Sequence, residues 1–278
     1  MQHEHGRLAS ADGTRLFWQT WHPDEVTAPS VVLVHGAGEH GGRYAWVAER
    51  LIERGHPVYA CDHRGHGRSD GPRAAIGRMA TLVADLRRFI ELLEDRPFLV
   101  GHSLGGAVAL NYAIEHGDTI EGLVLSAPAV ATEAVPAPLK AIVAALSKLA
   151  PGMPAFQIDA ELISRDADVV ADYRSDPLNW TGMLPARTLG ELLQNMDTIA
   201  DRVPKLRTPL LVLHGARDGL CPPTGSEMIH ARAGSRDKTL KLYPRLFHEI
   251  FNEPERGEVV HDLAAWLAQR SREPVGVT

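Results

Sequence analysis

A serine lies between two glycines where an apolar segment gives way to helix-forming residues. Residues 97–100 are typical of a buried strand and residues 107–113 of a helix, and Gly101, Ser103 and Gly105 form a G-x-S-x-G pattern between them. A sharp turn there exposes the serine hydroxyl, and the glycines leave space where a Cβ would collide with neighbouring chain. The pattern predicts that Ser103 is a nucleophile that forms a covalent acyl intermediate. The alternative is a glycine-rich turn with a capping serine.

A serine nucleophile needs a general base and an acid that orients the base. In an open parallel sheet such groups lie in loops at the carboxyl ends of strands. The strand-like run at 210–214 is followed by Asp218, and the run at 240–243 is followed by His248. We therefore expect His248 to accept the proton of Ser103, and Asp218 to fix the tautomer of His248. The alternatives are a cap on the helix after Pro222 as the role of Asp218, and a different acid at Asp201 or Asp237.

Attack on an ester creates a negatively charged oxygen that needs hydrogen-bond donors. The backbone amide of Leu104, directly after the serine, is one expected donor of this oxyanion hole. The other is expected from the glycine-containing loop at 35–38, at the amide of Ala37. Because backbone groups make these bonds, the side chains of both residues matter mainly through their shape.

The elements that must position these groups alternate between strand-like and helix-like segments. An aromatic, alternating run at 15–21 predicts an antiparallel strand near the start. Helical stripes at 46–52 and 79–93 separate the first continuous apolar runs, which are typical of strands buried on both faces. This alternation predicts an α/β fold with a mostly parallel sheet and helices on both faces. The strand-like runs lie at 30–34, 58–61, 97–100, 123–126, 209–214 and 239–243.

The alternation stops between residues 127 and 204. Prolines cluster there and helical stripes appear without a strand-like run, so we expect a helical cap inserted into the sheet domain. The predicted organisation is a first core part at 1–126, a cap at 127–204 and a second core part at 205–278. We also expect a disordered polar terminus near His3 and His5, and a last helix capped by Asn252.

Composition and charge narrow the class of function. The 278 residues carry a net charge of −6 with a pI near 6.2, which predicts no basic face for nucleic acid. Cys61 and Cys221 follow no metal-ligand spacing, so we expect no metal and reduced thiols in a cytoplasmic protein. The first residues lack the apolar segment of a secretory signal, and no apolar run approaches the roughly 18 residues that span a bilayer.

Seven short motifs lie along nearly the whole chain, at 35–44 (HGAGEHGGRY), 62–69 (DHRGHGRS), 101–106 (GHSLGG), 126–129 (SAPA), 175–178 (SDPL), 213–215 (LHG) and 248–253 (HEIFNE). Together they resemble the bacterial monoacylglycerol lipases of the α/β-hydrolase superfamily. The resemblance implies an eight-stranded sheet, a mobile helical cap, and hydrolysis of a monoacylglycerol to glycerol and fatty acid without a cofactor. It also implies that Glu39 and Arg43 handle the glycerol headgroup, with a structural salt bridge as the alternative, and that the loop at 62–69 braces the site.

The acyl chain of such a substrate needs apolar walls, because each buried methylene contributes about 0.8 kcal/mol. The segment 138–149 can provide such a wall. Alternatively, its apolar face lies on a membrane or micelle, as in a peripheral protein, or packs on the core. Asn179 and Trp180 are less aliphatic than the resemblance leads us to expect, which leaves the preferred chain length open. The expected wall residues are Leu139, Ile142, Val143, Leu146, Met153 and Phe156.

Two other functions stay open. One is a carboxylesterase for short-chain esters or for other lipid esters such as lysophospholipids, and the other is a non-catalytic ligand-binding protein, which would need a broken catalytic set. An epoxide or haloalkane hydrolase is disfavoured, because those enzymes use an aspartate where this chain has Ser103. The oligomeric state is undetermined by the sequence.

Overall fold

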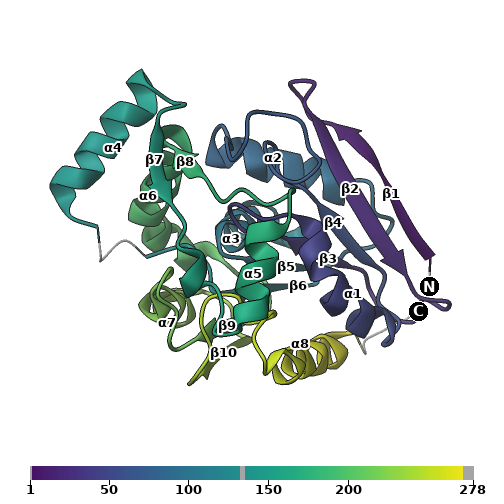
Figure 1. The fold of residues 1–278 in the computed structure, drawn as a ribbon. Coiled ribbons are helices and arrows are strands. Elements are labelled where there is room, and N and C mark those ends of the chain that lie inside the picture. Colours follow the sequence, from purple (N-terminus) through teal and green to yellow (C-terminus); the bar gives the residue numbers. More distant parts are fainter. Residues whose placement is uncertain (1, 132–134, 272–278) are drawn as a thin grey trace.

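The computed structural model describes residues 2–131 and 135–271. Residues 1, 132–134 and 272–278, which belong to the three predicted segments, lie outside the described residues. An eight-stranded sheet runs through the core in the order β1-β2-β4-β3-β5-β6-β9-β10 (Figure 1). β2 pairs antiparallel with β1 and β4, and every other neighbouring pair is parallel, which confirms the predicted fold class. The strands are β1 (Gln2–Ala9), β2 (Arg15–His22), β3 (Val31–Val34), β4 (Val58–Cys61), β5 (Phe98–His102), β6 (Gly122–Ser126), β9 (Leu210–Gly215) and β10 (Lys238–Tyr243).

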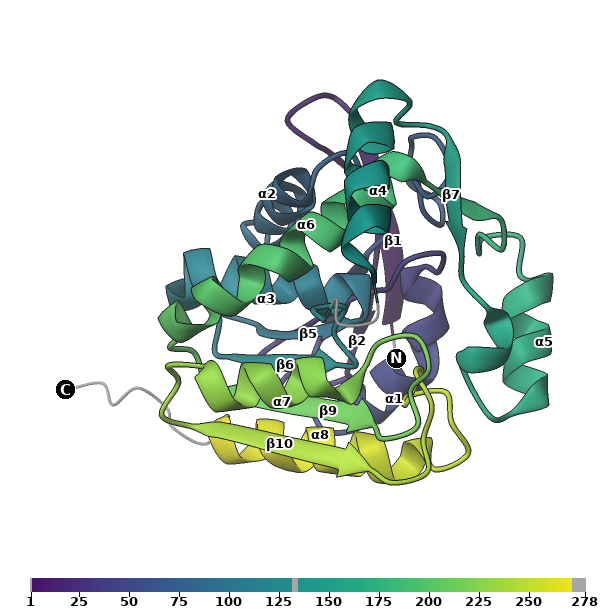
Figure 2. The same cartoon turned by 90° about the vertical axis from the view of Figure 1, so that its left-hand side faces the viewer.

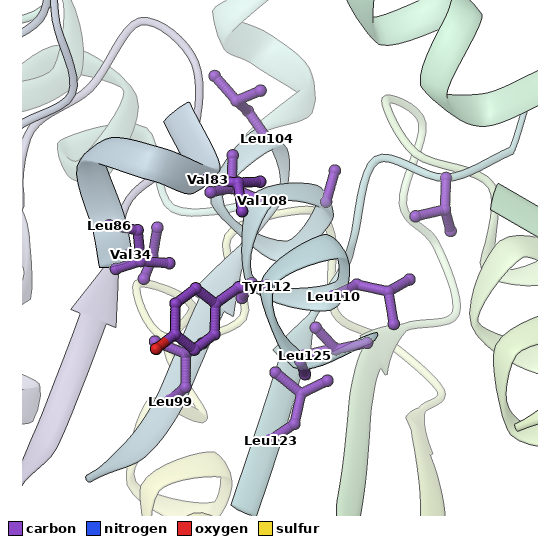
Figure 3. Close-up of a cluster of buried hydrophobic side chains, with 14 of the residues drawn as sticks. Val34, Val83, Leu86, Leu99, Leu104, Val108, Leu110, Tyr112, Leu123 and Leu125 are labelled. Carbon is purple, nitrogen blue, oxygen red and sulfur yellow. The ribbon is translucent and has the colours of Figure 1, made fainter. Parts of the chain in front are cut away.

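Helices cover both faces of this sheet, as the continuous apolar strands require. α1 (Ala45–Ile52) and α8 (Arg256–Arg270) pack into one hydrophobic cluster, whereas α2 (Met79–Ile90), α3 (Leu104–His116) and α7 (Pro223–Arg232) contribute to another. Figure 3 shows the second cluster, in which Leu104, Val108 and Tyr112 of α3 lie between α2 and the strands. Most residues of α3 are buried. This packing fixes the position of the helix, and with it the position of its N-terminus beside Ser103. Short 3₁₀ turns lie at Gly41–Tyr44, Gly117–Thr119 and Val203–Lys205.

The insertion between β6 and β9 contains helices and also two short strands. The sequence predicted no strand here, but β7 and β8 pair antiparallel as a separate ribbon. Their short, irregular pairing carries no alternating apolar pattern in the sequence, so the prediction of a purely helical segment is wrong. In Figure 2, α4 lies against α6 and α5 stands apart from both. The elements are α4 (Ala137–Leu149), β7 (Pro154–Gln157), a 3₁₀ turn (Ala160–Leu162), α5 (Ala167–Ser175), β8 (Met183–Pro185) and α6 (Ala186–Arg202).

Polar side chains fasten α6 to the core. Thr188 Oγ1 donates to the carbonyl of Ala74 at 2.7 Å, and Glu191 accepts from the amide of Met79 at 2.9 Å, at the first residue of α2. That amide is unsatisfied within its own helix, so Glu191 supplies the missing acceptor. α4 then crosses α6 closely, because a Cβ at Gly190 would lie 2.6 Å from Ser147 Cβ. α6 is therefore one of the elements through which the insertion is attached to the core.

Both chain ends differ from the sequence expectation. The polar N-terminal residues form β1, which pairs with β2 along its whole length and places His3 against Trp21 with ring centroids 5.2 Å apart. The last helix begins at Arg256 with Glu255 at its N-cap, because Asn252 instead donates its side-chain amide to Glu249 at 2.9 Å. Among the described residues, no helix combines the length and the apolarity needed to cross a membrane.

Candidate active site

Ser103 occupies a strained turn between β5 and α3. Its φ is 52° and its ψ is −118°, in a region that non-glycine residues rarely adopt. A Cβ at Gly105 would lie 2.1 Å from the carbonyl oxygen of Val34, so only glycine allows α3 to approach β3 this closely. The strand-turn-helix context that the sequence predicted is present. This turn places the serine side chain at the carboxyl edge of the sheet, where the site lies.

Asp218 and His248 are hydrogen bonded to each other, with 2.7 Å between Asp218 Oδ2 and His248 Nδ1. Both are buried, and each follows a strand of the sheet, β9 and β10 respectively. Asp218 Oδ1 accepts from the amides of Leu220 and Cys221 at 2.8 and 2.9 Å, so the carboxylate orientation is fixed. Ser103 and His248 line the same cavity, which brings the three predicted side chains into one site.

The rival acids lie elsewhere and are engaged with surface arginines. Asp201 contacts Arg232 at 3.5 Å, and Asp237 forms a two-pronged ion pair with Arg270. Neither lines the cavity that contains Ser103, as far as the described residues define it. Asp218 is therefore the acidic residue that the structure places beside the histidine.

The charges of the pair stabilise each other. Burial by itself lowers the pKa of His248, but the charge of Asp218 and their hydrogen bond outweigh burial and raise that pKa above its ordinary value. Burial would likewise raise the pKa of Asp218, yet His248 and His214 lower it well below its usual range. Asp218 is thus ionised, and His248 is a stronger base than a free imidazole.

The two residues whose amides were predicted as oxyanion donors line the same cavity. Ala37 and Leu104 both line it, and in residues 2–131 and 135–271 neither amide donates a hydrogen bond. Leu104 is the first residue of α3, where a free amide and the positive end of the helix dipole favour negative charge. The loop that carries Ala37 is fixed because the amide of Gly36 donates to Glu39 Oε1 at 2.5 Å. The assignment of these two amides to an oxyanion hole stays a prediction.

The cavity has a volume of about 570 Å³ and mostly apolar walls from the insertion. Leu139 and Val143 of α4 line it, as predicted, together with Phe156 of β7. The prediction does not hold for Ile142 and Leu146, which are absent from the lining among the described residues. Ile142 is 56% exposed, because α4 presents only one side of its broad apolar face to the cavity.

Comparisons with known proteins identify the family of this chain. The profile of the family described as serine aminopeptidase, S33, matches residues 26–255. The monoacylglycerol lipase of Mycolicibacterium smegmatis is 41% identical over 266 residues, which cover 94% of this chain and 95% of that protein. The chain belongs to the monoacylglycerol lipase family of the α/β-hydrolase superfamily.

Solved structures of monoacylglycerol lipases share this fold. The crystal structure of the Paleococcus ferrophilus monoacylglycerol lipase has a TM-score of 0.82 and 32% identity, covering 98% of this chain and all of that chain (100%). A soluble variant of monoglyceride lipase from Saccharomyces cerevisiae, in complex with a substrate analog, has a TM-score of 0.88 and 25% identity, covering 99% of this chain and 97% of the other. The family resemblance that the motifs indicated is thereby confirmed.

Two of the residues that the monoacylglycerol lipase resemblance singled out form an ion network. Arg43 donates to Glu39 at 3.0 Å and to both oxygens of Glu249 at 2.5 and 2.7 Å. Both glutamates are buried, and the Arg43 side chain is 11% exposed. Glu39 lines the cavity and also accepts from Tyr44, whereas Arg43 lies behind it. In this conformation Arg43 acts as the structural salt bridge that the sequence left as an alternative to headgroup contact.

The loop at 62–69 is bonded to the chain around the cavity in this member of the monoacylglycerol lipase family. Asp62 accepts from the amides of Gly41 and Arg68 at 2.8 and 2.9 Å, which ties the loop to the turn that carries Arg43. Arg64 pairs with the buried Asp85 of α2 at 2.8 Å. These bonds fit the bracing role that the resemblance implied.

Sequence reasoning missed much of the wall of the cavity. A signal was present in α6, where apolar residues recur at helical spacing. No comparable pattern marks the segment from β7 to α5, whose side chains reach the cavity through irregular chain. Asn179 and Trp180 hold that segment in place: Asn179 donates to the carbonyl of Tyr173 at 3.1 Å and the Trp180 amide to that of Gly38 at 2.8 Å. The missed wall residues include Ile158, Leu162, Ile163, Tyr173, Leu184, Leu189, Leu192, Leu193 and Met196.

Proposed function

We propose that this protein is a serine hydrolase that cleaves monoacylglycerols to glycerol and free fatty acid. The observation that carries the proposal is the buried Asp218–His248 hydrogen bond of 2.7 Å, beside an apolar cavity that Ser103 also lines. Relatives named monoacylglycerol lipase, at up to 41% identity over nearly the whole chain, support the same reaction.

The chemistry proceeds through an acyl-enzyme. His248, whose Nδ1 donates to Asp218, takes the Ser103 proton on Nε2 as the serine oxygen attacks the ester carbon. The amides of Ala37 and Leu104 donate to the oxyanion that forms. His248 then gives the proton to the departing glycerol oxygen. A water molecule, deprotonated by the same imidazole, releases the fatty acid and regenerates the serine.

The shape and polarity of the cavity favour a lipid with one long chain. Its volume of about 570 Å³ and its apolar walls suit an acyl tail, and each methylene buried there contributes about 0.8 kcal/mol. Glu39, close to Ser103, provides a polar group for the glycerol hydroxyls. We infer that the insertion acts as a cap that admits one acyl chain and excludes bulkier glycerides.

The test is hydrolysis of a monoacyl, diacyl and triacyl glycerol series of matched chain length. We expect turnover of the monoacyl lipid, strong preference for it, and loss of activity by a factor of about 10⁴ in Ser103→Ala, whose fold is retained. Labelling of the wild type, but not of Ser103→Ala, by a fluorophosphonate confirms an activated serine. A faster rate on acetyl than on lauroyl esters would instead identify a short-chain esterase.

We also propose that the insertion touches the lipid surface from which substrate is taken. Leu139 and Phe156 line the cavity yet are 49% and 44% exposed, so the apolar wall continues onto the outer surface. Ile142 and Leu149 extend this surface along α4, and Leu149 is 85% exposed. An apolar surface that joins the substrate cavity suits an interface from which a lipid enters.

Replacement of both Ile142 and Leu149 by serine tests this contact. We expect several-fold slower hydrolysis of monooleoylglycerol in phosphatidylcholine vesicles, with an unchanged rate on soluble p-nitrophenyl butyrate. Leu92→Ser is the control, because Leu92 is an exposed leucine outside the insertion, at 57% about as exposed as Ile142 at 56%. Equal rates of the double variant and the control on vesicles would reject the lipid contact.

A further inference from the structure

A second histidine binds the acid of the catalytic pair. His214 Nε2 lies 3.0 Å from Asp218 Oδ2, the same oxygen that accepts from His248 Nδ1 at 2.7 Å. His214 is the fifth residue of β9 and is fully buried. Its other nitrogen, Nδ1, lies 2.6 Å from the hydroxyl of Ser226 in α7. One carboxylate oxygen thus stands between two imidazoles, and only one of them faces the substrate cavity among the described residues.

The neighbours of His214 determine where its proton resides. Nε2 is 3.0 Å from the carbonyl oxygen of Cys221 as well as from Asp218, and both partners can only accept. Nε2 therefore carries the proton. Nδ1 lies 2.6 Å from the Ser226 hydroxyl, which can donate to it. The contacts thus allow a chain of donors from Ser226 through His214 to Asp218.

We propose that His214 is a positioning residue that shares the negative charge of Asp218 and so keeps His248 a free base near neutral pH. The inference rests on the roles of Asp218 and His248 given under the proposed function. An N–H donor on a carboxylate spreads its charge and weakens its hold on an imidazolium. Without the His214 donor, protonated His248 is more stable, and activity is lost at a higher pH as the solution is acidified.

The other charged groups near the pair are the same residues in the wild type and in the two His214 variants, so a shift that appears in only one variant reports the lost donor. Burial lowers the pKa of His248 and Asp218 raises it, with smaller contributions from the two glutamates beside the site. The rings of His102 and His248 lie 4.6 Å apart between centroids. The titratable and charged groups around the pair are Cys221 after β9, His102 of β5, Glu39 and Arg43 after β3, and Glu249 after β10.

A matched pair of substitutions isolates the donor. His214→Gln can place an amide N–H near the position of Nε2, whereas His214→Asn can reach Ser226 but is too short to reach Asp218. We expect the acid limb of kcat/KM to shift upward by about 0.5 to 1 pH unit in His214→Asn and to return to the wild-type position in His214→Gln. The same profile should appear in the rate of labelling by a fluorophosphonate, which needs only the first chemical step.

An equal loss of activity at every pH in both variants, with no shift of the limb, would reduce His214 to a packing residue and overturn the proposal. If His214→Asn does not fold, ¹⁵N spectra of the wild-type histidines decide instead: a proton on Nδ1 of His214 contradicts the donor chain, and a proton on Nε2 alone supports it. A wild type that neither hydrolyses esters nor reacts with fluorophosphonate would reject the proposed function itself, a result separate from an unmoved pH profile.

Discussion

Replacement of Arg43 by methionine removes the cation from a buried cluster of charges. Burial alone raises the pKa of both Glu39 and Glu249, but the Arg43 charge offsets it and holds the pKa of Glu249 below its ordinary value. Methionine fills much of the space and leaves two carboxylates near each other without a cationic partner, although Tyr44 and Asn252 still donate to them. Breaking a buried ion pair in this way costs about 3–5 kcal/mol of unfolding free energy.

The same magnitude follows from protonation. The Arg43→Met protein can relieve the repulsion by binding a proton on one carboxyl, whose ordinary pKa is 4.5. At pH 7 this costs about 1.4 kcal/mol for each of the 2.5 units, or about 3.4 kcal/mol, and at pH 5 it costs about 0.7 kcal/mol. A carboxyl whose folded pKa is raised stabilises the fold at low pH and loses that contribution as the pH rises. The penalty should therefore fall by about 2–3 kcal/mol between pH 7 and pH 5.

Urea unfolding followed by tryptophan fluorescence at the two pH values measures this penalty. Arg87→Met is the control, because Arg87 pairs with Glu91 on the exposed face of α2 and such surface pairs contribute about 0–1 kcal/mol. A penalty for Arg43→Met below about 1 kcal/mol, or one that is the same at pH 5 and pH 7, would refute the assignment of a buried structural network. A raised KM for monoacylglycerol without loss of stability would restore the headgroup role.

Three further outcomes follow from the geometry. Asp218→Asn should lower kcat on p-nitrophenyl butyrate by a factor of about 10³–10⁴, because the wrong histidine tautomer is favoured, while Asp237→Asn should change kcat less than about twofold. The reverse result would assign the role of the acid to Asp237. Gly105→Ala should fail to fold by circular dichroism, since its Cβ would lie 2.1 Å from the carbonyl of Val34. Burial lowers the pKa of His63 to about 3, so His63 by itself should contribute a loss of about 1.4 kcal/mol of stability per pH unit as the pH drops from 6.5 toward 3. Urea titrations should show a flatter slope in His63→Gln.

The parts of the site that sequence could predict are those that local chemistry dictates. A nucleophile at a strand-to-helix turn needs glycines two residues away, and an acid and a histidine must follow strands, so Ser103, Asp218 and His248 are marked by their own neighbourhoods. The alternation of apolar runs likewise predicts the parallel sheet. These signals are short in range, which is why one sequence suffices to find them.

The remaining features depend on contacts between distant residues. Arg43 could be a headgroup ligand or an ion pair until Glu249, 206 positions away, is placed beside it. The polar strand β1 carries no apolar alternation and exists because β2 offers it a full register of partners. His214 precedes Asp218 by four residues in the sequence, yet a buried histidine in a strand usually signifies core packing, so its bond to the carboxylate emerges only in three dimensions.

The attachment of α6 to the core bears on how such proteins diversify. Thr188 and Glu191 tie this helix to the segments around Ala74 and Met79, while α4 rests on it at the Gly190 crossing. The inner helix therefore supports α4, whereas Ile163 and Trp180 are bonded to the loops of the site: the Glu249 amide donates to the carbonyl of Ile163 at 2.7 Å and the Trp180 amide to that of Gly38 at 2.8 Å. Replacement of α4 alone would then change the cavity wall while these bonds beside the acid and the base stay in place.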